Sequence, residues 1–65
     1  MVTINGEAAD AAGRSVGEVL REDGYDSRSV AVEYNGRILS KSEYASTVLQ
    51  DNDAMEIVCF MGGGC

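Results

Sequence analysis

Apolar and polar residues alternate in several short parts of the chain, a pattern typical of β-strands with one buried face. Two of these parts are interrupted by Asn-Gly, the dipeptide that most strongly favours a two-residue hairpin turn. One hairpin is expected at Asn5-Gly6 and a second at Asn35-Gly36. The longest strand-like segment follows a turn cluster at residues 50–53. The strands are therefore expected at residues 1–5, 7–11, 30–34, 38–39 and 54–61.

One amphipathic helix is expected between the two hairpins. Ser15 and Glu18 have the spacing of a capping box, in which each side chain accepts a hydrogen bond from the other residue's backbone N–H. Gly24 is suited to end the helix in a left-handed conformation. The apolar residues that share one face of this helix are Val16, Val19 and Leu20. We expect a helix over residues 16–23, and at most one further helical turn within residues 40–47.

This order of elements predicts an α+β domain, in which a mixed sheet of four to five strands packs on one main helix. The chain has 65 residues, so residues 1–65 are expected to form a single small domain near the lower size limit for one hydrophobic core. The alternation of residues does not fix the order of the strands in the sheet.

Composition narrows the classes of function. Eleven acidic and five basic residues give a net charge of −6, which argues against nucleic acid, because that binding depends on neutralising phosphates. The chain has no histidine, so it lacks the commonest general base and the commonest transition-metal ligand. No apolar run reaches the roughly 20 residues needed to span a membrane, and no signal peptide is visible. We expect a cytoplasmic domain that is not an enzyme and holds no metal.

The last four residues, Gly62-Gly63-Gly64-Cys65, carry the clearest functional signal. Glycine costs extra backbone entropy to order, so a run of three is poor material for a packed fold. It is suited to a thread that enters a narrow active site of another protein. We therefore expect residues 61–65 to be a flexible tail, and the chain to be a substrate that enzymes modify at this end.

The two cysteines, Cys59 and Cys65, could be read as a metal or redox pair. Two thiols without a histidine or further cysteines make an incomplete zinc site. Strand alternation places Cys59 on the same face as Met55 and Ile57. Cys59 is therefore expected to be a small buried hydrophobic residue rather than a functional thiol.

Taken together, these features resemble the ThiS family, small sulfur carrier proteins of the thiamine-biosynthesis type. The resemblance covers residues 1–64, and it implies a ubiquitin-like β-grasp fold with the first and last strands parallel in the centre of the sheet. Its most specific part is residues 56–64. The matching segments are the Asn5-Gly6 hairpin, the helix start Ser15-Val16-x-Glu18-Val19-Leu20, residues 30–36, and residues 49–64 with Asp51, Asp53 and Met55.

The resemblance also implies a chemistry for the glycine tail. In the family, an activating (ThiF-like) enzyme uses ATP and Mg²⁺ to adenylate the C-terminal glycine carboxylate, which is then converted to a thiocarboxylate. In the thiamine pathway the sulfur passes to a thiazole synthase (ThiG-like). The chain itself is expected to bind no cofactor. Gly64 is the implied attachment site, with Gly62 and Gly63 threading into the partner's active site.

Cys65 departs from the family pattern, because it follows the glycine whose carboxylate would react. We expect a protease to remove it and expose Gly64. Three alternatives remain open: Cys65 carries the sulfur as a persulfide, an N-to-S acyl shift places Gly64 on the Cys65 thiol as a thioester, or Cys65 is incidental.

Val58, Phe60 and Met61 are the candidate partner interface near the tail. Strand alternation places Val58 and Phe60 on the face opposite Met55. They either cover the second face of the sheet or form an apolar patch that docks partner enzymes. Given the resemblance, we favour docking for Phe60 and leave Val58 undecided.

Three other functions remain as alternatives. The chain could carry sulfur for another pathway, such as molybdopterin or sulfur amino acid synthesis. It could instead be a ubiquitin-like binding module, or a modifier whose glycine tail is joined to a lysine. A small thiol redox protein is the third alternative.

Overall fold

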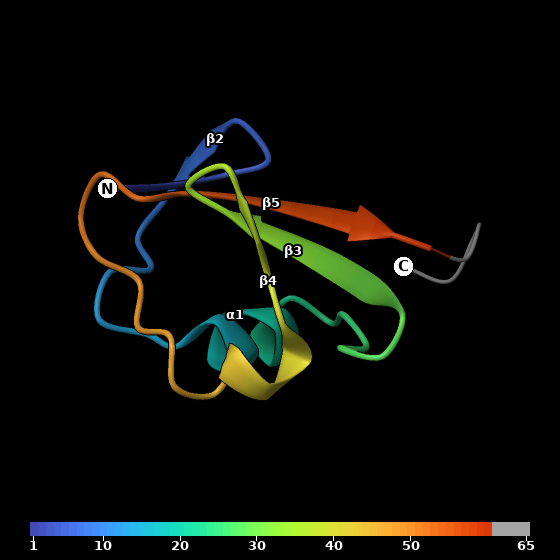
Figure 1. Ribbon diagram of the computed structural model, residues 1–65. Coiled ribbons are helices and arrows are strands. Elements are labelled where there is room, and N and C mark those ends of the chain that lie inside the picture. Colours follow the sequence, from blue (N-terminus) through green and yellow to red (C-terminus); the bar gives the residue numbers. More distant parts are fainter. Residues whose placement is uncertain (61–65) are drawn as a thin grey trace.

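The computed structural model describes residues 1–60, and residues 61–65 lie outside this part. The predicted flexible tail therefore falls outside the described residues. Five strands, one α-helix and one 3₁₀ turn make up the described part (Figure 1). In chain order these elements are β1 (Val2–Ile4), β2 (Glu7–Ala9), α1 (Val16–Glu22), β3 (Val30–Tyr34), β4 (Arg37–Leu39), η1 (Lys41–Glu43) and β5 (Ala54–Cys59).

The five strands form one mixed sheet in the order β2-β1-β5-β3-β4. The last strand, β5, lies in the centre, parallel to β1 and antiparallel to β3. Each outer pair, β1 with β2 and β3 with β4, is a hairpin. The α+β class is confirmed, and so is the central parallel pair that the family resemblance implied.

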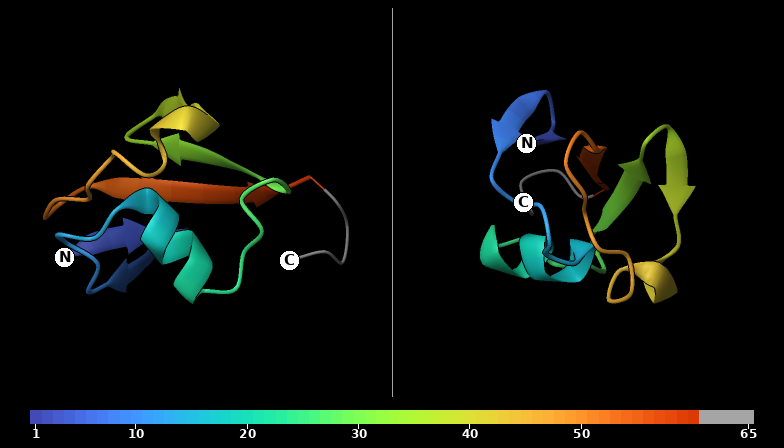
Figure 2. Two further views of the ribbon diagram at one scale, coloured as in Figure 1. Left: turned by 90° about the horizontal axis from the view of Figure 1, so that it is seen from below. Right: turned by 90° about the vertical axis from the view of Figure 1, so that its left-hand side faces the viewer.

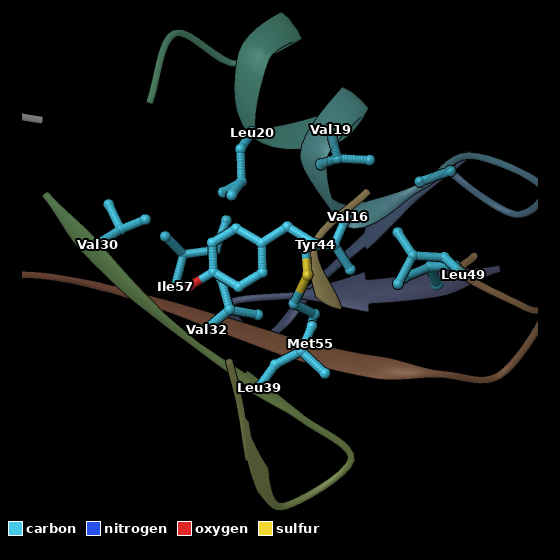
Figure 3. Packing of buried hydrophobic residues seen from close by; sticks show 12 residues of the cluster. Val16, Val19, Leu20, Val30, Val32, Leu39, Tyr44, Leu49, Met55 and Ile57 are labelled. Carbon is cyan, nitrogen blue, oxygen red and sulfur yellow. The ribbon is translucent and has the colours of Figure 1, made fainter. Parts of the chain in front are cut away.

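The hydrophobic core lies between the sheet and α1. Both α1 and η1 lie on the same side of the sheet (Figures 1 and 2). Apolar side chains of α1 point toward those of the central strands (Figure 3). The core residues are Val2, Ala11, Val16, Val19, Leu20, Val30, Val32, Leu39, Tyr44, Leu49, Met55 and Ile57. Among residues 1–60, no helix is long and apolar enough to span a membrane.

The element boundaries differ from the sequence prediction by one or two residues. The helix ends at Glu22, and Gly24 follows with φ +83° in the left-handed region, as predicted for a helix end. The second strand ends at Ala9 rather than at residue 11, because Ala11 turns into the core. The last strand ends at Cys59, and the chain bends at Phe60.

The two Asn-Gly turns also fasten the hairpins to the central strand. Asn5 and Asn35 both have φ 51°, the left-handed conformation that such turns require. The Asn5 Oδ1 accepts a hydrogen bond of 2.7 Å from the Ile57 N–H. The Asn35 Oδ1 accepts one of 2.8 Å from the Ala54 N–H. Each asparagine thus forms its own turn and pairs with a backbone group of β5.

A carboxylate just before β5 completes this attachment. Asp53 accepts hydrogen bonds from the Tyr34 hydroxyl and, at 3.1 Å, from the Asn35 side-chain amide. The hydrogen bond from Tyr34 lowers the pKa of Asp53, because it stabilises the charged carboxylate. The same bond raises the pKa of Tyr34, since the hydroxyl must keep its proton to donate. The start of β5 is therefore tied to the β3–β4 hairpin by side chains as well as by the sheet.

Substitution of Asn5 tests whether its side chain stabilises β5. We expect Asn5→Ala to lower the free energy of unfolding by about 2 kcal/mol, because it leaves the half-buried Ile57 N–H without its acceptor and strains the turn. Asn5→Asp keeps an acceptor oxygen and tolerates the left-handed conformation, so it should retain most of the stability. Chemical denaturation measures the free energy of unfolding of both variants. Equal losses would contradict a role for the Asn5–Ile57 hydrogen bond.

Candidate functional site

The candidate site begins where β5 leaves the sheet. The register pairs of β1 with β5 end at Ile4–Met55, whereas β3 pairs with β5 as far as Val30–Cys59. The Phe60 N–H then donates a hydrogen bond of 2.9 Å to the Ser29 carbonyl. The predicted reactive residues, Gly62, Gly63, Gly64 and Cys65, together with Met61, lie outside the described residues. The structure therefore places Phe60, the residue directly before this segment.

Lys41 of η1 contacts both the start of β3 and Phe60, directly after β5. Its Nζ donates hydrogen bonds to the carbonyls of Ser27 and Val30, at 2.8 and 3.0 Å. The same Nζ lies 5.7 Å from the centroid of the Phe60 ring and 5.9 Å from that of Tyr44, within the range of cation–π attraction. Lys41 therefore joins η1, the segment before β3 and the end of β5.

Sequence reasoning missed Lys41 because the basic residues look scattered along the chain. Lys41 and Phe60 are 19 positions apart, and no periodic pattern connects them. The contact also changes the picture of Phe60, whose side chain is 65% exposed. Phe60 lies at a bend directly after Cys59, the last residue of β5, and its ring lies beside Lys41.

The side of the sheet that faces away from α1 is the second part of the candidate site, and we call it the open face. Val2, Val32 and Met55 are buried toward α1, so the residues next to them in each strand point the other way. Val58 and Ile38 are the large apolar side chains there, 57% and 66% exposed. The open face consists of Thr3, Ala8, Ala31, Glu33, Ile38, Ala54, Glu56 and Val58.

Cys59 lies on the α1 side of β5, half-buried and packed against the core. The prediction of a small buried residue is met only in part, because Cys59 packs against the core but is not fully buried. Its predicted alternative, a pair with Cys65, involves a residue outside the described part. Among residues 1–60, no three His, Cys, Asp or Glu side chains come together to hold a metal ion.

An open groove of about 500 Å³ lies between α1 and the segment that contains η1. Leu20, Arg21, Asp26 and Lys41 are among the residues that line it. In the described part of the chain, no buried side-chain polar atom lacks a hydrogen-bond partner. The groove therefore has no unpaired buried group that would recognise a ligand.

Comparison with known proteins identifies the chain. A sequence profile of the ThiS family matches residues 2–64, which include the three glycines. The chain belongs to the ThiS family. The crystal structure of the thiamine biosynthesis protein ThiS from Geobacter metallireducens superposes with a TM-score of 0.77, at 36% sequence identity over 97% of both chains. The fold is thus the ubiquitin-like β-grasp of this family.

Curated relatives of two kinds match nearly the whole chain. The sulfur carrier protein ThiS of Thermus thermophilus is 38% identical over 98% of this chain and 100% of its own length. The thiazole synthases of Paramagnetospirillum magneticum and Magnetococcus marinus are 48% and 39% identical over 97% of this chain. The chain spans only 20% of the length of these two synthases.

Substitution of Lys41 tests its role at the end of β5. We expect Lys41→Met to lower the free energy of unfolding by about 1 kcal/mol, because methionine keeps an apolar stem but loses the hydrogen bonds and the cation–π contacts. The control is Arg37→Met, which removes the same charge from a side chain that forms no ion pair among residues 1–60. If denaturation curves show equal losses for the two variants, the effect is one of net charge, and the proposed role of Lys41 is wrong.

Proposed function

We propose that this chain is a sulfur carrier whose Gly64 carboxylate is adenylated and then converted to a thiocarboxylate. The observation that carries the proposal is the ThiS family match, which extends through the glycine run to residue 64. The full-length similarity to the sulfur carrier protein ThiS of Thermus thermophilus supports it. In this proposal the chain is a substrate and carrier, and its partner enzymes supply the catalytic groups.

The chemistry requires an activated acyl group. A carboxylate is a poor acyl donor until one of its oxygens becomes part of a good leaving group. Attack of the Gly64 carboxylate on the α-phosphorus of ATP releases pyrophosphate and forms an acyl-adenylate. Sulfur at the oxidation level of sulfide then attacks the acyl carbon and displaces AMP, which leaves a thiocarboxylate. The activating enzyme provides ATP, Mg²⁺ and stabilisation of the developing charge.

The last residues need only be narrow and reachable for this role. Gly62 and Gly63 carry no side chains, so the segment before the reactive carbon can enter a confined active site. β5 supports this arrangement, because the sheet, Ser29 and Lys41 anchor Phe60 directly before that segment. The partner can therefore bind the folded domain and receive the residues that follow Phe60.

Cys65 must leave before Gly64 can react. The Gly64 carbonyl is part of a peptide amide as long as Cys65 follows it, and an amide has no carboxylate oxygen to attack ATP. We propose that a protease hydrolyses the Gly64–Cys65 bond. The alternative with a persulfide on Cys65 has less support, because an unperturbed thiol has a pKa of about 8.5 and the net charge of −6 disfavours the thiolate further.

We propose thiazole synthase as the sulfur acceptor. Two curated thiazole synthases contain a stretch 48% and 39% identical to nearly all of this chain. In those proteins the carrier-like stretch and the rest of the synthase belong to one polypeptide, as expected for two units that work together. This observation favours the thiamine pathway over molybdopterin or sulfur amino acid synthesis.

Intact-mass spectrometry of the chain from its native host tests the proposal. We expect the isolated protein to lack Cys65 and to carry one sulfur in place of one oxygen at Gly64.

Substitution of Gly64 tests which residue reacts. Gly64→Ala should strongly slow adenylation by the activating enzyme, because a methyl group at the reacting residue obstructs a site shaped for glycine. The free energy of unfolding should stay unchanged.

Other masses would redirect the assignment. A chain that keeps Cys65 and gains one sulfur on its thiol would replace the thiocarboxylate with a persulfide. A lysine-linked adduct would identify a protein modifier. If Gly64→Ala is adenylated as fast as the parent chain, Gly64 is not the reacting residue.

A further inference from the structure

Two carboxylates face each other on the open face. Glu33 of β3 and Glu56 of β5 are direct cross-strand partners, and both are exposed. Like charges in directly opposite positions destabilise a sheet. Within residues 1–60, neither carboxylate forms an ion pair. The fold therefore holds two negative charges together without a compensating cation.

The basic residues of the chain lie elsewhere in the fold. Arg37 is the cross-strand partner of Tyr34, which faces the α1 side, and Lys41 belongs to η1. Arg28 pairs with Asp26 in the segment before β3. The remaining two are Arg14, which pairs with Glu22 of the helix, and Arg21 within α1. The open face thus carries negative charge alone.

Apolar side chains flank the two carboxylates. Val58 is the cross-strand partner of Ala31, and Ile38 is that of Glu33. Glu33 lies on β3, between the strands of Val58 and Ile38, and Glu56 lies beside Glu33 on the strand of Val58. A protein that covers both apolar side chains therefore also covers the two carboxylates. Burying a carboxylate is costly unless a cation pairs with it. A partner of this face therefore needs an apolar surface with a positive charge at its centre.

We propose that the open face docks on thiazole synthase, with a lysine or arginine of the synthase placed between Glu33 and Glu56. An arginine suits the position best, because its planar group has five N–H donors and can serve two carboxylates. Apolar side chains of the synthase pack against Val58 and Ile38. The inference rests on the proposed function and adds the chemistry by which the acceptor recognises the carrier.

Two observations favour the synthase as occupant. The carrier-like stretch of the two thiazole synthases belongs to the same polypeptide as the rest of the enzyme, which keeps their surfaces close. Val58 also lies two residues before Phe60, so a protein that receives the glycine segment reaches this end of the open face. A second copy of the chain is disfavoured, because it would bring the same carboxylates and a further net charge of −6.

The test compares two double variants that have the same net charge. Glu33→Gln with Glu56→Gln removes the facing carboxylates, and Glu7→Gln with Asp23→Asn removes two carboxylates from the α1 side. Titration calorimetry measures binding of each full chain to the thiazole synthase of the same organism, at low and at high salt. We expect the open-face variant to bind roughly tenfold more weakly at low salt, with a smaller difference at high salt. The control should bind as the parent chain does.

A stability measurement shows that the loss of binding is not a folding defect. Removal of the facing charges should raise the midpoint of thermal unfolding above that of the control variant. Weaker binding together with a more stable fold would support the proposal.

Several results would overturn the proposal. The open face is not the docking surface if the parent chain and the open-face variant bind the synthase equally well, or if both double variants bind equally weakly. Either result leaves the carrier function itself to be decided by the mass measurement. No binding of the parent chain would refute both this inference and thiazole synthase as acceptor. Sedimentation shows whether the chain associates with itself. If it does, and if the open-face substitutions change that association, the open face is the contact between two copies of the chain.

Discussion

The last strand of the chain lies in the centre of its sheet, and the rest of the structure depends on this placement. β5 is parallel to β1 and antiparallel to β3, so both hairpins are joined through it. The asparagines of the two turns accept hydrogen bonds from its backbone at Ala54 and Ile57. This central strand ends at Cys59, one residue before the end of the described part of the chain.

The pleat of β5 separates two roles. Met55 and Ile57 point into the core beneath α1, while Glu56 and Val58 point to the open face. The core side stabilises the domain. The open face has exposed apolar side chains and two uncompensated carboxylates, a combination that a free protein gains nothing from. We interpret it as a surface shaped for a partner, next to the point where the reactive segment departs.

Local signals in the sequence were sufficient for most elements. The two Asn-Gly pairs predicted both hairpins, and the Ser15–Glu18 capping box is present at the start of α1. Residue contacts that depend on distant parts of the chain could not be read in this way. The contact of Lys41 with Phe60 and the facing of Glu33 and Glu56 arise only when β3 and β5 pair, and no spacing along the chain encodes that register. Strand alternation placed Val58 correctly, whereas the approach of Lys41 to the Phe60 ring depends on η1 and lies beyond what alternation within one strand can predict.

Native-state hydrogen exchange of the Ile57 amide tests the central claim most directly. Its N–H donates to Asn5 in the half of β5 that lies beyond the register pairs with β1. If β5 is the element on which the fold depends, this amide exchanges only through global unfolding, as slowly as the Val32 amide of β3. Rapid exchange of Ile57 through local opening, while β3 stays protected, would show that the end of β5 is not anchored and would contradict the account.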